Sequence, residues 1–255
     1  MLQNPGEGHP GCWQLGESVE DFIKRLPPVT TSGLLYEWIW VHNPYQKGHC
    51  EPQFSKVDEF TIRGQELLMK NLQMRKAIEA NDQNKTKDTV TRRLNEESEL
   101  LQQRITDLAV QTNVLSGKWM LFLSLEELTR VWRLIVDGVI NNRLGPVAKV
   151  APEQGKPGER LICIYTKDFR DKDDIRRVLQ ELVSMGVTGT GKNTIHYKSD
   201  PYTCLNIYRQ TAAQYGLKAS LYSSQELLAE GEQEYDVLYP LTQSNLNRFL
   251  NNAPQ

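Results

Sequence analysis

The stretch "GKWMLFLSLEELTRVWRLIVDGV", residues 117–139, contains the change of pattern on which the fold depends. Residues 117–123 are mostly apolar and aromatic, which is typical of a buried strand, and apolar residues recur at helical spacing from Leu125 onward. Ser124 stands between the two patterns with Glu127 three residues later, which predicts a capping box. The stretch therefore predicts a strand that passes directly into an amphipathic helix.

The segments on either side of this stretch alternate between strand and helix patterns. Further predicted helices are "ESVEDFIKRL" (17–26), "DDIRRVLQELVSM" (173–185) and "YTCLNIYRQTAAQYG" (202–216). Further predicted strands are "LLYEWIWVHNP" (34–44), "GPVAKVAP" (145–152), "RLICIYT" (160–166) and "TIHYKS" (194–199). Alternation in the first of these puts Trp38 and Trp40 on one face. This mixture predicts an α+β fold with a largely antiparallel sheet.

Residues 57–111 differ in composition from the rest of the chain. They are rich in Glu, Gln, Lys and Arg, with apolar residues at helical spacing and a polar patch, "NDQNKTKD", in the middle. We predict a helical hairpin, inserted at about 57–111 into a single domain that spans residues 1–255. The hairpin is either a binding surface for a protein partner or an inserted element with a solvated face.

The bulk properties restrict the function. The chain has 255 residues and a formal net charge of −2, so nucleic-acid binding requires a local basic patch. It contains no run of 18 apolar residues, and residues 1–13 lack the pattern of a signal peptide. Its four cysteines are far apart, which is typical of reduced thiols. We expect a cytoplasmic protein, present also in the nucleus, that does not bind membranes.

The stretch "GVTGTGKNT", residues 186–194, resembles a phosphate-binding loop. Gly186, Gly191 and Lys192 have the required spacing, but Asn193 stands where a magnesium-binding hydroxyl belongs. A phosphate-binding loop follows a strand and precedes a helix, whereas this stretch follows a predicted helix and precedes a predicted strand. We interpret Gly186 as the glycine that ends the helix and the stretch as a turn.

No other motif predicts catalysis or metal binding. His42, His49 and Cys50 lie close together, but one cluster without a second pair of ligands is a weak zinc signal. The aspartates of "DFRDKDD" (168–174) stand at a predicted helix start, where acids serve as caps. We therefore expect no catalytic residue, no metal site and no cofactor, and a protein that is not an enzyme.

The hairpin 147–166 carries the candidate binding residues. Lys149, Lys156 and Arg160 surround a flexible Gly-Pro loop and offer cationic donors to phosphate or an RNA backbone. Tyr165 is placed to stack on a base. The alternative is a solvated hairpin tip with Tyr165 in the core, and spacing leaves both interpretations open.

Several of these motifs together resemble a known family. "VLSGKWMLFL", "GPVAKVAP", "LICIYTKDF" and "HYKSDPYTCLNIYR" are similar, in this order, to the basophilic-leukaemia-expressed protein family, which is uncharacterised. The resemblance implies the fold of translation initiation factor 4E, the messenger-RNA cap-binding protein. It implies a curved antiparallel sheet with helices on its convex side and a ligand groove on its concave side.

The residues that bind the cap in the initiation factor are changed in this chain. The resemblance puts Leu108 at the position of one cap-stacking tryptophan and Ala109 at the position of its acidic neighbour. It puts Tyr165 at the position of a tryptophan that touches the methyl group, and Ala151 at the position of a phosphate-binding arginine. A leucine cannot supply the cation–π contact that reads methylated guanine, so we expect no cap binding by the usual mechanism.

The surface that binds the scaffold partner is changed as well. The resemblance keeps Trp132 but puts Arg133 and Asp137 at two leucine positions of that surface. Two charges on an apolar docking stripe disfavour the same partner peptide. We therefore expect Trp132 and Trp119 to be core residues.

Two hypotheses about function follow. The first is a non-catalytic module that binds RNA or a nucleotide-like ligand, with Lys149, Lys156 and Arg160 on phosphate, Tyr165 on a base and Lys198 lining the groove. The second is a protein-interaction adaptor that binds its partner through residues 57–111 and has no ligand site.

Overall fold

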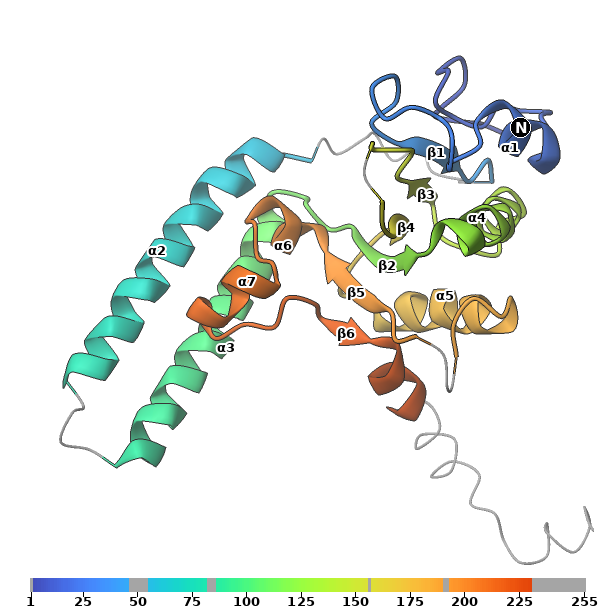
Figure 1. Ribbon diagram of the computed structural model, residues 1–255. Helices are drawn as coiled ribbons and strands as arrows, with labels where there is room; N and C mark the ends of the chain where they lie inside the picture. Colours follow the sequence, from blue (N-terminus) through green and yellow to red (C-terminus); the bar gives the residue numbers. More distant parts are fainter. Residues whose placement is uncertain (1, 46–54, 82–85, 156, 190–192, 231–255) are drawn as a thin grey trace, which may run out of the picture.

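The protein is described by a computed structural model that covers residues 2–45, 55–81, 86–155, 157–189 and 193–230. Its strands and helices follow one another along the chain (Figure 1). The helices are α1 (Val19–Arg25), α2 (Val57–Asn81), α3 (Lys87–Gln111), α4 (Leu125–Ile140), α5 (Lys172–Ser184), α6 (Asp200–Cys204), α7 (Arg209–Ala212) and the short 3-10 helix η1 (Ala213–Tyr215). The strands are β1 (Ile39–His42), β2 (Gly117–Leu123), β3 (Val147–Val150), β4 (Arg160–Thr166), β5 (His196–Ser199) and β6 (Tyr222–Ser223).

The strands form one open, curved sheet in the order β1-β3-β4-β2-β5-β6, and neighbouring strands are antiparallel. β2 is central and pairs along its whole length with β4. β3 and β4 form the predicted hairpin, with Ala148 opposite Ile164 and Val150 opposite Ile162. The predicted α+β class with an antiparallel sheet is therefore confirmed.

The strand and helix predicted at residues 117–139 are confirmed as β2 and α4, but the predicted capping box is wrong. Ser124 is the N-cap residue with extended backbone angles, yet its side chain makes no cap hydrogen bond. The Glu127 carboxylate accepts a hydrogen bond from Arg130 Nε at 3.0 Å, on the helix surface. Glu126 and Glu127 still favour the helix, because they place negative charge in its first turn.

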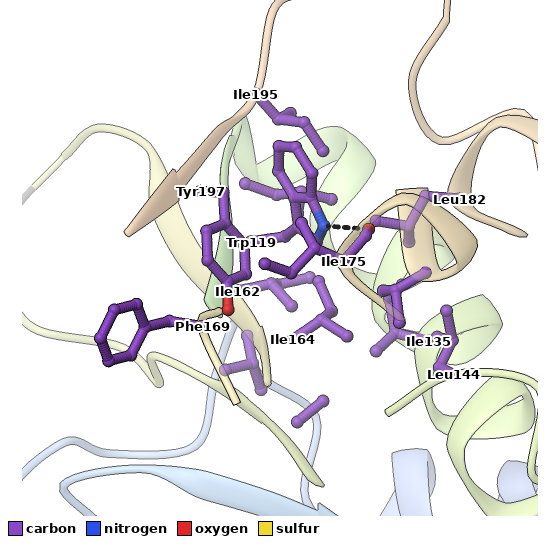
Figure 2. Close-up of a cluster of buried hydrophobic side chains, with 14 of the residues drawn as sticks. Trp119, Ile135, Leu144, Ile162, Ile164, Phe169, Ile175, Leu182, Ile195 and Tyr197 are labelled. Carbon is purple, nitrogen blue, oxygen red and sulfur yellow. Dashed lines mark hydrogen bonds between the residues drawn. The ribbon is translucent and has the colours of Figure 1, made fainter. Parts of the chain in front are cut away.

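One face of the sheet forms the main core with α4 and α5. Figure 2 shows side chains from β2, β4, β5 and the two helices meeting there, with Trp119 and Tyr197 in contact near the centre. The indole Nε1 of Trp119 donates to the Ile175 carbonyl of α5 at 3.1 Å. Trp119 and Trp132 are both fully buried, which confirms that they are core residues.

α2 and α3 form the predicted helical hairpin, which packs against α6 and η1 near the start of β2 (Figure 1). Its inner residues join the core; they are Phe60, Leu68, Leu101, Ile105, Leu108 and Ala109. Gly64 of α2 packs against Leu205, because a Cβ there would lie 2.5 Å from a Leu205 methyl carbon. The hairpin is thus packed against the segment that follows β5 and is part of the folded body.

β1 is shorter than the strand predicted at residues 34–44. Ile39 and Val41 are fully buried, whereas Trp38 and Trp40 are only partly buried, so the predicted division between faces is confirmed. The outer edge of β1 is covered by the N-terminal segment, since Trp13 N donates to the Trp40 carbonyl and Trp40 N to the Gly11 carbonyl. A covered edge cannot pair with a strand of another chain.

The stretch that resembles a phosphate-binding loop follows α5, as predicted. Gly186 has φ +70° and stands one residue after the C-cap, Met185, in the place of a helix-ending glycine. Val187 N donates to the Leu182 carbonyl at 3.0 Å, which closes the helix end. Gly191 and Lys192 lie outside the described residues.

The predicted helix at residues 202–216 is divided into α6, α7 and η1. Asn206, with φ +55°, separates α6 from α7, and Gly216, with φ +69°, ends η1. Among the described residues, no helix combines the length and the apolar character that crossing a bilayer requires.

Candidate ligand-binding site

The face of the sheet opposite the core carries a row of lysine and aromatic side chains. In β2, Lys118 points away from the face on which Trp119 and Leu121 are buried. Lys118 lies directly opposite Tyr165 of β4 and Lys198 of β5, so the three side chains share one face. On the same face, Lys149 of β3 lies opposite Trp40 of β1. We call this surface the lysine–aromatic face.

Lys149 is surrounded by aromatic rings. Its ammonium lies 4.0 Å from the centre of the Trp38 ring, 4.8 Å from Trp40 and 5.7 Å from Tyr165. It makes no ion pair with any carboxylate of the described residues. Burial is the main cause that lowers the pKa of Lys149; Cys163, Asp200 and Glu37 act in the opposite direction, and the Lys118 ammonium adds to the lowering. Ring quadrupoles attract this ammonium, but no described residue offers it a hydrogen-bond acceptor.

Lys198 is the second lysine whose charge is not neutralised. Lys198 is 4% exposed, and its ammonium lies 3.7 Å from the centre of the Tyr208 ring. Within the described part of the chain it has no ion pair. Its pKa is lowered to about 8, mainly by burial and also by the Lys118 ammonium, whereas Asp200 acts in the opposite direction.

Lys118 differs from Lys149 and Lys198 because its ammonium has both an ion pair and a hydrogen bond. Its ammonium forms an ion pair with Asp200 and donates to Thr203 Oγ1 at 3.0 Å. The other carboxylate oxygen of Asp200 accepts from the Ser116 hydroxyl. The lysine–aromatic face therefore brings three ammonium groups around one carboxylate whose two oxygens are already engaged. Such a surface attracts anions.

Lys149 and Lys198 are separated by three strand spacings. The strands between them are β4 and β2, and neighbouring strands lie about 4.8 Å apart, so their backbones are roughly 14 Å apart. Tyr165 and Lys118 lie between them, with the Lys118 ammonium 5.4 Å from the Tyr165 ring centre. A ligand that engages both unpaired lysines is therefore extended and carries more than one anionic group.

The structure places the five predicted site residues differently. Lys149, Tyr165 and Lys198 lie together on the lysine–aromatic face, with Tyr165 half-buried between two lysines. Arg160 does not join them. It shares the alternation of Ile162 and is 4% exposed, and its guanidinium donates to the Gly158 carbonyl at 3.1 Å. Lys156 lies outside the described residues.

Other residues of this face were not singled out from the sequence. They are Lys118, Asp200 and Tyr208, together with Trp38 and Trp40, whose shared face was predicted but to which no role was given. The alternation of "GKWMLFL" already separates Lys118 from the buried Trp119. No sequence signal joins Tyr208 to Lys198, because their contact depends on the path of the chain after β5.

The candidate metal ligands are not brought together within the described residues. His42 stacks on Trp40 with ring centres 6.2 Å apart, and His49 and Cys50 lie outside the described part. Burial, with a contribution from His9, lowers the pKa of His42. In the ranges that the structure covers, no three His, Cys, Asp or Glu residues form a group that could hold a metal ion. Cys12, Cys163 and Cys204 are free thiols.

These features define an α+β protein with one face of an open antiparallel sheet packed against helices and the other bearing lysines and aromatic rings. The model of one protein family, described as basophilic leukemia-expressed protein Bles03, matches residues 1–206. The chain belongs to this family, as the motifs quoted above indicated. The match includes the strands β1 to β5, and hence every lysine of the lysine–aromatic face.

Proposed function

We propose that this protein is a non-catalytic module that binds RNA or a nucleotide-like ligand on the lysine–aromatic face. The observation that carries the proposal is that half-buried Lys149 and buried Lys198 lie against aromatic rings without a carboxylate partner among the described residues. Phosphate oxygens supply the acceptors that these ammonium groups lack, and the rings supply surfaces on which bases stack.

The spacing of the two lysines favours a ligand with several phosphates. A gap of roughly 14 Å between their backbones suits two non-adjacent phosphates of a short single strand, or the polyphosphate and sugar-base parts of one nucleotide. Lys118 stands between them with its ammonium fixed by Asp200 and Thr203, so it adds positive potential at a defined place. We expect this arrangement to bind the backbone of a ligand without reading its sequence.

The likeness to translation initiation factor 4E supports a ligand on this face, but it does not extend to the cap sandwich. Leu108 and Ala109, at the positions of the cap-reading residues, are buried at the end of α3 and have no free surface for a base. Trp38, Trp40 and Tyr165 are the rings that a base would meet instead. We therefore expect capped and uncapped RNA to bind alike.

Replacing both unpaired lysines with methionine tests the proposal. Lys149→Met with Lys198→Met keeps chain length and removes two charges, and should weaken binding of a fluorescent short oligouridine at least roughly tenfold in anisotropy titrations, about 1.4 kcal/mol. Lys24→Met, on the exposed surface of α1, removes the same kind of charge and should leave binding unchanged. Equal affinity of wild type and double variant, with both folded by circular dichroism, would reject the proposal.

A second candidate function is a protein-interaction adaptor that uses the α2–α3 hairpin. Ile62 and Met69 of α2 are 63% and 58% exposed, and their spacing of seven residues puts them on one helix face. Because the hairpin also contributes core residues, its deletion would disturb the fold, and surface variants are the cleaner test. If this face binds a partner, Ile62→Asp with Met69→Asp should abolish the partner's co-purification, whereas Met74→Asp, on another face, should not. If the partner still co-purifies with the Ile62→Asp and Met69→Asp double variant, this function is excluded.

A further inference from the structure

Lys198 has surroundings that are unusual for a lysine. Its side chain is almost fully buried on β5, and its ammonium lies against the Tyr208 ring. Lys118, which carries a second ammonium group, lies directly opposite Lys198 on the neighbouring strand β2. The nearest carboxylate that acts on it, Asp200, is already bound by Lys118 and Ser116. Lys198 is thus held beside a like charge, and no described residue gives its ammonium a hydrogen-bond acceptor.

These surroundings favour the neutral amine over the ammonium. Burial removes the water that stabilises the charged form, and the Lys118 ammonium repels it. Since the pKa of Lys198 is lowered to about 8, roughly a tenth of the Lys198 side chains are neutral at pH 7, against less than a thousandth for an ordinary exposed lysine. A neutral lysine amine is a nucleophile toward carbonyl compounds, and burial beside another cation is a recognised way to produce one.

The exposed Tyr208 ring covers this amine. Tyr208 is 43% exposed and belongs to the chain that follows α6, and its ring lies against the Lys198 ammonium, so movement of this ring would make the amine more accessible. Behind that ring, Lys118 offers positive charge at the distance of a neighbouring strand. The site therefore combines an amine with an adjacent ammonium, which Asp200 and Thr203 hold in place.

We propose that Lys198 forms an imine with a small aldehyde or ketone that carries a phosphate group, with the phosphate lying against Lys118. The neutral amine of Lys198 attacks the carbonyl carbon, and proton transfer from nitrogen to oxygen gives a carbinolamine. Loss of one water from the carbinolamine leaves the C=N bond, so the step needs no oxidant, reductant or further reactant. This covalent chemistry goes beyond the non-covalent binding proposed above and does not depend on it.

Pyridoxal 5′-phosphate is a suitable probe, because it carries an aldehyde and a phosphate on one small ring. The full chain is treated with less than one equivalent, reduced with borohydride and mapped by peptide mass spectrometry. We expect Lys198 to be labelled first, at a rate that rises with pH around a midpoint near 8. 5′-Deoxypyridoxal, which lacks the phosphate and cannot close to a hemiacetal, should label it at least roughly tenfold more slowly, because the attraction of Lys118 is lost.

Three variants make the result decisive. Lys198→Arg keeps the charge and should lose the label, whereas Lys218→Arg, at a lysine with an 82% exposed side chain, should keep it. Tyr208→Ala should speed labelling. Modification of Lys218 before Lys198 overturns the proposal, and so do equal rates of Lys198 labelling by 5′-deoxypyridoxal and pyridoxal 5′-phosphate. Lys149→Met should leave labelling unchanged while it weakens RNA binding, so that failure of either proposal is distinguishable from failure of the other.

Discussion

Trp119 and Trp132 are both fully buried, but their indole N–H groups differ in hydrogen bonding. Trp119 donates to the Ile175 carbonyl, whereas Trp132 Nε1 has no acceptor within the described part of the chain. Replacing Trp132 with phenylalanine removes an unsatisfied donor, but the same change at Trp119 removes a hydrogen bond. We therefore expect Trp119→Phe to lower the free energy of unfolding by about 1 kcal/mol more than Trp132→Phe. Urea denaturation of the two variants measures this difference, and a larger loss in Trp132→Phe would contradict it.

Single residues also show how much of the candidate site can be predicted from the sequence. Alternation within one strand is local, so it separates Lys118 from Trp119 and Tyr165 from Ile164 without any knowledge of the fold. Alternation within "RLICIYT" also places Arg160 on the face of Ile162 and Tyr165 on the other face. The prediction that put Arg160 beside Tyr165 did not take this alternation into account. Pairings across strands are not local. The ion pair of Lys118 with Asp200 joins residues 82 positions apart, and no spacing in the sequence indicates it.

Among the elements, the α2–α3 hairpin depends on a glycine outside it. Gly216 has φ +69°, and a Cβ there would lie 2.1 Å from Ser98 Oγ and 2.7 Å from an Arg75 guanidinium nitrogen. These side chains are themselves joined by a hydrogen bond of 2.9 Å across the hairpin. The close approach of η1 to the hairpin therefore allows no side chain at this position.

Substitution of this glycine tests the docking of the hairpin. Gly216→Ala should destabilise the protein by about 2–3 kcal/mol, from left-handed backbone strain of about 1 kcal/mol plus the displacement of Ser98 and Arg75. Gly16 is the matched control, since it also has positive φ (+83°) but no atom within 4 Å of its Cβ position. Gly16→Ala should cost only the backbone strain. Thermal unfolding compares the two, and equal losses would show that η1 does not dock tightly on the hairpin.

The elements themselves were largely predictable, because periodicity is a property of each segment. The two 25-residue helices of the hairpin, the helix 172–184 and the strand pair 147–150 and 160–166 all follow patterns within their own sequence. The predicted helix at 202–216 is different. It is divided because Asn206 adopts φ +55° where Ile207 is buried in the core, a requirement set by tertiary packing. Tertiary packing therefore limits what local patterns can predict.

At the scale of the whole molecule, a net charge of −2 coexists with a face on which two ammonium groups have no carboxylate partner in the part of the chain that the structure describes. A polycation binds nucleic acid through many phosphates, but this chain offers few unneutralised cations on the proposed surface. The number of phosphates that it neutralises should therefore be small. Single strands release about 0.7 counterion per neutralised phosphate, so two contacts predict a slope of about −1.4 in a plot of log K against log salt concentration.

This slope distinguishes binding on the lysine–aromatic face from diffuse attraction. The variant Lys149→Met with Lys198→Met should bring the slope close to zero, because the two contacts that release counterions are gone. Lys24→Met should keep the wild-type slope, since α1 packs with α4 on the opposite side of the sheet (Figure 1). Anisotropy titrations of oligouridine over a series of potassium chloride concentrations measure all three. A wild-type slope several times steeper, or an unchanged slope in the double variant, would mean that RNA meets other lysines and arginines of the chain and that the unpaired ammonium groups have another ligand.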